Sequence, residues 1–397
     1  MESASHLRWL AISVFVLSSA LNYLDRMVLS AIAPTLMSEF HLDSQNFGYL
    51  ISAFSLTYAF SAPLMGLLID RIGLTAGACI VVGLWSLAGI STGFTNSFAG
   101  LLLCRAALGF AEAGGIPASG KAMAVYLPPK DRAMGAALSQ IGLTIGSVGA
   151  PLLTALLMLR HGWRSVFVTS GMLGFLWIPL WLYTARRVPA APGPSEQARP
   201  SLAGMLRDRR FLGLTLANVL AMTVYSLWTV WTTHFLVKRF QLTQQEANSG
   251  FAWIPPIFAT LGGLLGGWVA LRLIRSGLPV LQARSRIALW AAVFVCMTAA
   301  APLMPTPALA TAAVCASLFA ITCLSVNYYS IPLDIFGPQR AGFAVSVLTG
   351  SFGLMQTFLS PLIGRWCDQY GYQPVCTLVA ILPLASYGVL QLALRNK

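Results

Sequence analysis

Four charged residues lie inside apolar stretches of this sequence that are long enough to cross a membrane. They are Asp25, Arg26, Arg105 and Glu112. A charge at the centre of a bilayer costs about 2.5–3.5 kcal/mol on insertion scales, so such residues need a function or a fixed partner. An arginine can bind an anionic substrate, and a buried carboxyl group can take up and release a proton. Of the 12 acidic residues, only Asp25 and Glu112 lie deep inside an apolar stretch.

The spacing of the four charges indicates how their side chains are arranged on the helices. Arg105 and Glu112 share one helix face two turns apart, about 10 Å along the axis, whereas Asp25 and Arg26 point about 100° apart. The pattern indicates proton–anion coupling, in which each ligand raises the affinity for the other. The alternative is two structural salt bridges between the first and fourth spans. Buried ion pairs stabilise less than apolar packing does, which favours the functional interpretation.

Composition excludes several classes of protein. The chain has 397 residues, of which 57% are hydrophobic and 9% charged, against about 25% charged in soluble domains. A soluble or disordered protein is excluded on these values. The 7 Cys residues show no metal-ligand or disulfide-scaffold spacing. We expect no metal, no cofactor and no nucleic-acid partner. An enzyme is not expected, because the sequence offers no nucleophile or metal set.

Twelve apolar stretches have the length of a membrane-spanning helix, about 20 residues. They lie near 8–34, 46–69, 76–94, 97–120, 133–159, 163–184, 210–236, 246–271, 284–302, 307–331, 338–365 and 371–394. A polar, Pro-rich break divides them six and six. The sequence therefore predicts an N-terminal bundle (1–185), a linker (186–209) and a C-terminal bundle (210–397).

The loops predict the orientation of the chain. Seventeen Lys and Arg residues fall on the side that holds both termini and the linker, and five on the other. Positive residues are enriched on the cytoplasmic side, so we expect both termini there.

Polar and aromatic residues in other spans are further candidates for substrate contacts. Tyr225, Trp228 and Trp231 share one helix face, where sugar rings could stack; interfacial or lipid-facing aromatics are the equal alternative. Gln140, Asn327 and Gln356 could bond substrate hydroxyl groups; interhelical hydrogen bonds are the alternative.

Span 5 carries three glycines at helical spacing. Gly142, Gly146 and Gly149 predict close helix packing.

Several motifs resemble the major facilitator superfamily. Gly66 to Gly73 fits its loop signature GxxxDRxG, and Arg105 to Gly109 fits RxxxG. Asn22 to Arg26, together with the Arg105/Glu112 pair and Tyr126 to Pro128, is similar to the anion:cation symporter family, which includes transporters of hexuronates and aldonates. The resemblance covers essentially the whole chain and is looser in the C-terminal half.

The resemblance implies roles for individual residues. Arg26 would contact a substrate carboxylate, and Asp25 and Glu112 would carry protons. Tyr23 and Tyr58 would line the site.

The same resemblance implies parts of the gates. Arg105 would partner Glu112 or belong to the outer gate. Asp70 and Arg71 would belong to a cytoplasmic gate that pairs with the other bundle in one state; a simple helix-end turn at Gly73 is the alternative.

We therefore expect an all-α polytopic membrane protein with 12 transmembrane helices in two six-helix bundles, the major facilitator fold, and a site at the midplane. The expected function is proton-coupled symport of a small organic anion by alternating access. The substrate would be a sugar acid such as a hexuronate or aldonate, and the protein a monomer in the inner membrane of a bacterium. The alternatives are a drug/proton antiporter, which the deep arginines disfavour, and an uncoupled anion facilitator or exchanger. A membrane-embedded sensor is a further rival, disfavoured because the longest hydrophilic stretch is the linker.

Overall fold

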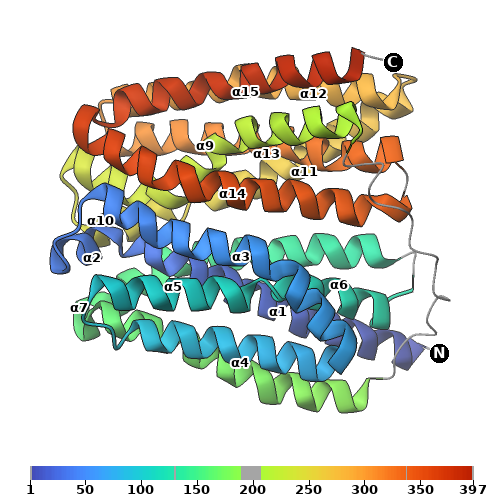
Figure 1. Ribbon diagram of the computed structural model, residues 1–397, viewed down its shortest axis with the longest axis horizontal. Coiled ribbons are helices and arrows are strands. Elements are labelled where there is room, and N and C mark those ends of the chain that lie inside the picture. The colour runs from blue at the N-terminus through green and yellow to red at the C-terminus, as the bar shows by residue number, and fades with distance from the viewer. Residues whose placement is uncertain (1, 129–130, 189–206, 337, 396–397) are drawn as a thin grey trace. The chain divides into compact units, whose positions relative to one another are not determined.

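All the regular elements of the computed structural model are helices within the residues that it describes, 2–128, 131–188, 207–336 and 338–395 (Figure 1). In the first half they are α1 (Glu2–Ala31), α2 (Ala33–Glu39), α3 (Ser44–Ile72), α4 (Leu74–Thr92), α5 (Phe98–Glu112), α6 (Gly115–Tyr126) and α7 (Arg132–Arg187). In the second half they are α9 (Arg209–Phe240), α10 (Gln244–Ala247), η2 (Asn248–Ala252), α11 (Pro255–Arg275), α12 (Val280–Val295), η3 (Cys296–Leu303), α13 (Pro307–Phe336), α14 (Pro338–Tyr370) and α15 (Tyr372–Arg395). Most of the predicted linker, 189–206, lies outside the described residues.

The described helices supply twelve membrane spans. Eleven helical stretches are long and apolar enough to cross a bilayer, and one of them, Met134–Arg187, runs for 54 residues. Gly162 interrupts this stretch with φ 72° and ψ 174°, a left-handed conformation that glycine adopts without steric cost. The stretch therefore counts as the fifth and sixth spans, and the predicted all-α polytopic fold class is confirmed.

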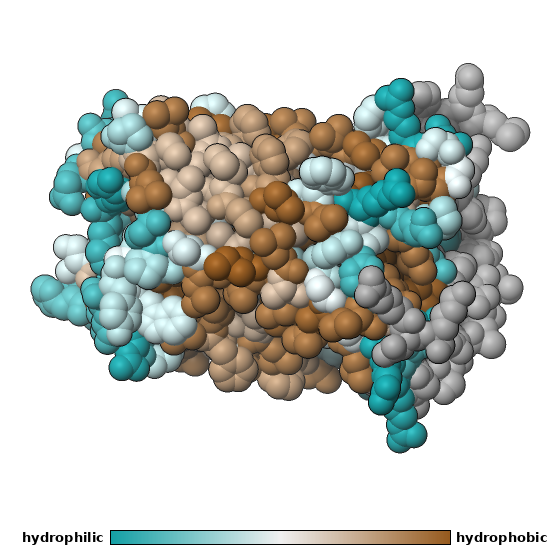
Figure 2. Space-filling view, turned by 90° about the horizontal axis from the view of Figure 1, so that it is seen from above, coloured by the Kyte–Doolittle hydropathy of each residue, from teal (hydrophilic) through white to brown (hydrophobic). Residues whose placement is uncertain are grey.

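The outer surfaces of the helices suit a lipid environment. Many large apolar side chains are exposed, among them Leu103, Trp290 and Phe358. Figure 2 shows apolar residues over the middle of the helices and hydrophilic residues toward their ends. A soluble monomer rarely exposes apolar patches of this extent, whereas hydrocarbon accepts them at no cost.

Contacts divide the chain into two compact units. The first unit holds Met1–Leu42, Tyr49–Gln197 and Gln244–Trp253, and the second holds Asp43–Gly48, Ala198–Thr243 and Ile254–Lys397. Each unit thus contains a short segment from the other half of the sequence, at the start of α3 and at α10 and η2.

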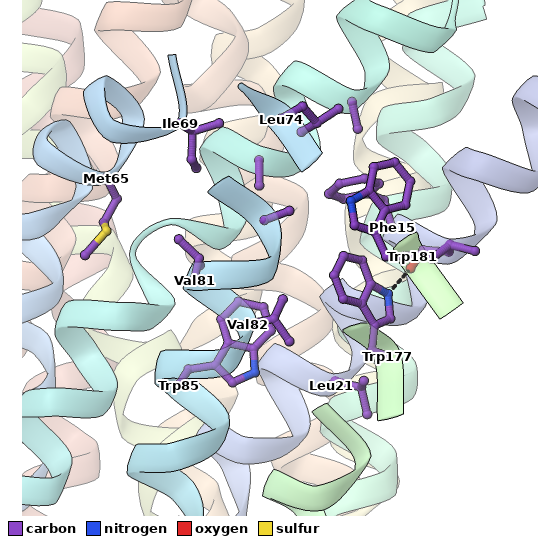
Figure 3. Packing of buried hydrophobic residues seen from close by; sticks show 14 of the residues in the cluster. Phe15, Leu21, Met65, Ile69, Leu74, Val81, Val82, Trp85, Trp177 and Trp181 are labelled. Carbon is purple, nitrogen blue, oxygen red and sulfur yellow. Dashed lines mark hydrogen bonds between the residues drawn. The ribbon is translucent and has the colours of Figure 1, made fainter. Parts of the chain in front are cut away.

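The first unit is built around an aromatic core. Phe15 of α1 packs edge-on against Trp181 and Trp177 of α7, with ring centroids 4.6 and 5.6 Å apart (Figure 3). The two tryptophans stack on each other, and Trp177 Nε1 donates a hydrogen bond of 2.6 Å to the carbonyl oxygen of Val14. Because that bond ties an aromatic side chain to the α1 backbone, the core fixes the position of α1, which carries Asp25 and Arg26.

Glycines bring α7 onto the α1 backbone. A Cβ atom at Gly146 would fall 2.1 Å from the carbonyl oxygen of Ala20, and one at Gly142 would fall 2.5 Å from that of Val16. The predicted close packing is confirmed at these two positions. At Gly149 a Cβ would make only an ordinary contact of 3.5 Å, with Leu24.

In the second unit, buried polar side chains join α9 to its neighbours. Tyr328 of α13 and Ser386 of α15 share a hydrogen bond of 2.9 Å, and Ser386 donates another to the carbonyl oxygen of Ala217. The Asn218 amide donates to the carbonyl oxygen of Leu348 in α14. These bonds give polar groups that lie away from water a partner, and two of them set the register of α9 against α14 and α15.

The start of α3 is held by a carboxylate of the second unit. Asp368 accepts hydrogen bonds of 2.7 Å from both the backbone N–H and the hydroxyl of Ser44, and it pairs with Lys238 at 2.9 Å. The first N–H groups of a helix lack partners within the helix, and a carboxylate there also meets the positive end of the helix dipole. Asp368 therefore caps α3 from α14.

We expect Asp368→Ala to destabilise this capped end. Hydrogen bonds to charged groups contribute about 1.5–3 kcal/mol, and this side chain is about one-third exposed, so a loss near 2 kcal/mol is expected. The measurement is thermal unfolding together with hydrogen exchange of the amides at the start of α3. The matched comparison is Asp43→Ala, which removes the carboxylate that bonds the amide of Asn46 in the same turn, and it should raise exchange at Asn46 and not at Ser44. Unchanged exchange at Ser44 in Asp368→Ala would contradict the capping role.

Candidate functional site

The site is built around an ion pair between α1 and α5. Arg26 Nη2 and Nε donate hydrogen bonds of 3.1 and 3.2 Å to the same oxygen, Oε2, of Glu112. The Arg26 side chain is 19% exposed, whereas that of Glu112 is fully buried. Arg26 therefore connects a buried acid to the accessible surface of the first unit.

Three aromatic rings surround the Arg26 guanidinium group. Its Cζ lies 4.9 Å from the ring centroid of Tyr23 and 4.8 Å from those of Phe54 and Tyr58. Aromatic faces within about 6 Å attract a cation. The predicted site residues Tyr23 and Tyr58 are thus brought together with Arg26. Phe54 is a neighbour that the sequence reasoning missed, although it precedes Tyr58 by four residues and so shares its helix face.

Asp25 is the second buried acid of the cluster. Only 2% of the residue is exposed, and neither carboxylate oxygen has a partner at close hydrogen-bond geometry among the described residues. Glu112 and Arg105 act on it through their charges, and the Ser170 hydroxyl is a nearby donor. A poorly hydrogen-bonded carboxylate is costly to bury, so this position suits a carboxyl group that can carry a proton.

Arg105 lies in the same cluster and is 1% exposed. Within the described part of the chain its Nε and Nη1 atoms have no hydrogen-bond partner, and its Cζ lies 4.9 Å from the Phe54 ring centroid. The sequence offered Arg105 as a partner of Glu112 or part of the outer gate. The hydrogen bonds to Glu112 instead come from Arg26, and Arg105 acts on Glu112 only through its charge.

A turn within the fourth span directly follows Glu112. Helix α5 ends at Glu112 and α6 begins at Gly115, with Ala113 and Gly114 forming a turn between them. The two helices together form one span, Phe98–Tyr126, as the sequence predicted. The last carbonyl groups of α5 carry partial negative charge, which favours a cation such as Arg26 beside them.

The predicted gate residues Asp70 and Arg71 lie at the end of α3, outside this cluster. Asp70 pairs with Lys121 of α6 at 3.0 Å, and the Lys121 ammonium also donates to the carbonyl oxygen of Ile69. In this structure Asp70 thus has a partner within its own unit, and its pairing in another state of the transport cycle stays a prediction. Arg71 is exposed. Gly73 follows with φ 88°, so the helix-end turn of the alternative interpretation is present.

The candidates on α9 lie in the second unit. Trp228 is 1% exposed and packs edge-on against Phe235, with centroids 5.3 Å apart, so it belongs to the packed interior of that unit. Tyr225 is half-buried, and its ring packs edge-on against that of Phe352 with centroids 6.1 Å apart. Of these two predicted substrate contacts, only Tyr225 keeps an accessible surface.

The three polar candidates also differ in whether they are accessible. Asn327 is fully buried, and its amide donates to the carbonyl oxygens of Cys323 and Gly266. These are interhelical and intrahelical bonds, the alternative that the sequence left open. Gln356 of α14 is half-buried, and Gln140 of α7 is exposed.

The charges of the cluster balance. Two carboxyl groups and two guanidinium groups sum to zero when all are ionised, and each proton taken up leaves one arginine charge uncompensated. An anion would then be attracted to the site. Among the described residues no group of three or more His, Cys, Asp or Glu side chains has the geometry to hold a metal ion. The carboxyl groups of the cluster can bind protons, and its guanidinium groups can bind an anion.

The sequence profile of the Major Facilitator Superfamily matches residues 15–356 of the chain. The chain belongs to this superfamily. Its members are transporters, and the protein is accordingly a multi-pass membrane transporter and not an enzyme.

Two relatives within the superfamily have names that specify a sugar acid. The chain is 29% identical to the hexuronate transporter of Escherichia coli K12, over 100% of its own length and 96% of that protein. It is 32% identical to the galacturonate transporter of Dickeya chrysanthemi, over 66% of its own length and 81% of that protein. These matches confirm the predicted resemblance.

A solved structure supports the major facilitator fold. A bacterial homologue of the human lysosomal transporter Spinster, in an inward-facing and occupied conformation, aligns with a TM-score of 0.79 and 21% identity. The alignment covers 97% of this chain and 96% of that one.

Proposed function

We propose that the protein is a proton-coupled symporter that carries a small organic anion, a sugar acid such as a hexuronate or aldonate, across the inner membrane of a bacterium. The observation that carries the proposal is the Arg26–Glu112 pair, in which a partly accessible guanidinium is held by a buried carboxylate. Both relatives named above are bacterial sugar-acid transporters by name, which supports the substrate class.

Proton and anion binding help each other in this arrangement. A proton on Glu112 removes the negative charge that holds Arg26, and the guanidinium then becomes available to a substrate carboxylate. The anion in turn replaces Glu112 as the partner of Arg26, so that Glu112 takes its proton more easily. By linkage each ligand raises the affinity for the other. Asp25, buried and poorly hydrogen-bonded, is the second group that carries a proton.

The test is proton uptake by proteoliposomes that enclose a pH-sensitive dye. Galacturonate, glucuronate, galactonate and lactate are added outside in turn, and uptake of the radiolabelled acid is measured in parallel. We expect one sugar acid to acidify the lumen. Glu112→Gln and Asp25→Asn should each lower acid-driven proton entry by at least about tenfold, because the titrating group is gone.

The matched control is Glu39→Gln, the same change at an acid that pairs with Arg164 outside the cluster. It should leave proton entry within about twofold, as expected for a partly exposed pair. Entry of labelled acid without a proton signal would replace symport by a facilitator or exchanger. No entry of any acid, with a lipophilic cation dissipating an imposed pH gradient, would identify a drug/proton antiporter.

A further inference from the structure

One aromatic ring contacts both arginines of the site. The centroid of the Phe54 ring lies 4.8 Å from Cζ of Arg26 and 4.9 Å from Cζ of Arg105. Phe54 is 6% exposed, so both contacts are shielded from water. Cation–π attraction is strongest when the pair is desolvated. The ring therefore joins the arginine from α1 to the arginine from α5.

Phe54 matters most for Arg105. This guanidinium is 1% exposed, and its Nε and Nη1 atoms have no hydrogen-bond partner within the described residues. A buried cation with unpartnered N–H groups is costly unless another group compensates its charge. The negative face of the Phe54 ring supplies such compensation beside Arg105.

The position of Phe54 is fixed by backbone packing. A Cβ atom at Gly109 of α5 would fall 2.3 Å from the carbonyl oxygen of Phe54 and 2.5 Å from Oγ1 of Thr57. The α3 backbone thus presses against the helix that carries Arg105 and Glu112. Phe54 also stacks on Tyr58, with ring centroids 5.7 Å apart and planes inclined by 25°.

An aromatic ring differs from a carboxylate in one respect that matters for a proton-coupled cycle. Its attraction for a cation involves no proton, so it persists when Glu112 and Asp25 are protonated. At that stage both arginines lose the charges that otherwise compensate them. Phe54 is then the neighbour shared by Arg26 and Arg105 whose attraction is unchanged.

We propose that Phe54 is a positioning residue that holds Arg26 and Arg105 in place independently of protonation, so that Arg26 meets the substrate in a fixed orientation. The role in transport rests on the proposed function above. The contact between the Phe54 ring and the two arginines does not depend on the proposed function. The experiment therefore measures both transport and stability.

The experiment replaces Phe54 with phenylalanine that carries one, two or three ring fluorines. Fluorine withdraws electron density from the ring face and hardly changes its shape, so a purely packing role predicts a flat series. We expect KM for the transported acid to rise stepwise, by about 5- to 30-fold at three fluorines, while kcat changes little. The unfolding temperature should fall stepwise by a few °C.

The matched control is the same fluorinated series at Phe60. This residue lies on the same helix, is 66% exposed and should give flat KM and unfolding temperatures. A second control repeats the Phe54 series in Arg105→Met, where the fall in unfolding temperature should become smaller because one of the two cations is gone.

Three outcomes decide the matter. Stepwise changes in both KM and unfolding temperature support the proposal. A stepwise fall in unfolding temperature with a flat KM overturns the positioning role, and flat values of both overturn the proposal altogether. If the unmodified protein transports no acid, the proposed function fails, and the unfolding series still decides whether the ring holds the arginines.

Discussion

Arg26→Gln is expected to abolish uptake of the transported acid and to lower the stability of the protein. Both hydrogen bonds to Glu112 Oε2 come from Arg26, and the other oxygen, Oε1, has no partner within the described residues. Removing one member of a buried pair typically costs about 3–5 kcal/mol, because the other charge stays buried and uncompensated. Thermal unfolding and uptake by proteoliposomes measure the two effects.

The double variant Arg26→Gln/Glu112→Gln separates binding from structure. With both charges gone no uncompensated acid remains, and two amides can hydrogen bond to each other. We expect its unfolding temperature to return close to that of the native protein while uptake stays below about 1%, as expected when a group that binds the substrate is missing. Recovery of uptake together with stability would show that the pair is only structural, which is the alternative that the sequence left open.

Gly146→Ala is expected to have the second large effect. The new Cβ would fall 2.1 Å from the carbonyl oxygen of Ala20 and 2.8 Å from the amide nitrogen of Leu24. Both are backbone atoms of α1, so the helix itself must move. Overpacking of this kind costs about 1–3 kcal/mol. Because Asp25 follows Leu24 directly, the shift also displaces the site, and a misplacement of about 1 Å can cost on the order of 100-fold in rate.

Gly149→Ala is the control for this change. It lies on the same helix and would meet only Leu24 Cδ1 at 3.5 Å, an ordinary contact. Alanine is also the better helix former by about 1 kcal/mol, so this variant should keep its transport and match or exceed the native stability. Equal transport by the two variants would mean that the spacing of α1 and α7 does not control the site.

Much of the fold follows from local patterns in the sequence. The spans are readable because a bilayer demands about 20 apolar residues in each helix. The four deep charges are equally readable, since the spans hold few other charged residues. Gly142 and Gly146 predicted a close helix contact because small residues at helical spacing permit close approach, and the structure shows that the partner is α1.

Local patterns in the sequence could not predict which of the four charges pair with one another. The resemblance implied Arg105 as a partner of Glu112 or part of the outer gate, and the sequence alternative was salt bridges between the first and fourth spans without named pairs. In the structure Arg26 of α1 bonds Glu112 of α5. Contacts between two helices depend on their tilt and on their axial shift relative to each other. Neither of these leaves a periodic signal in the sequence. Phe54 was missed for the same reason, because nothing on α3 alone shows that two arginines lie against its ring.

The second unit shows a further limit. Trp228 has the residue type of a sugar-stacking ring, but it packs against Phe235, and the Asn327 amide is used by neighbouring carbonyls. Helical periodicity tells which residues share a face and not what that face meets. The turn at Ala113 and Gly114 was not predicted, because it lies inside a single continuous span. The orientation of the chain and the roles of the site residues stay predictions.

The cap on α3 also constrains how the chain is completed during synthesis. Ser44 and its acceptor Asp368 are 324 residues apart, so at about 5–20 residues per second the ribosome adds Asp368 roughly 16–65 s after Ser44. Throughout that interval the Ser44 amide at the start of α3 lacks its carboxylate acceptor. The second transmembrane helix of the chain is therefore among the first to be made and among the last to be finished, and a nascent chain arrested before α14 should show an unprotected Ser44 amide.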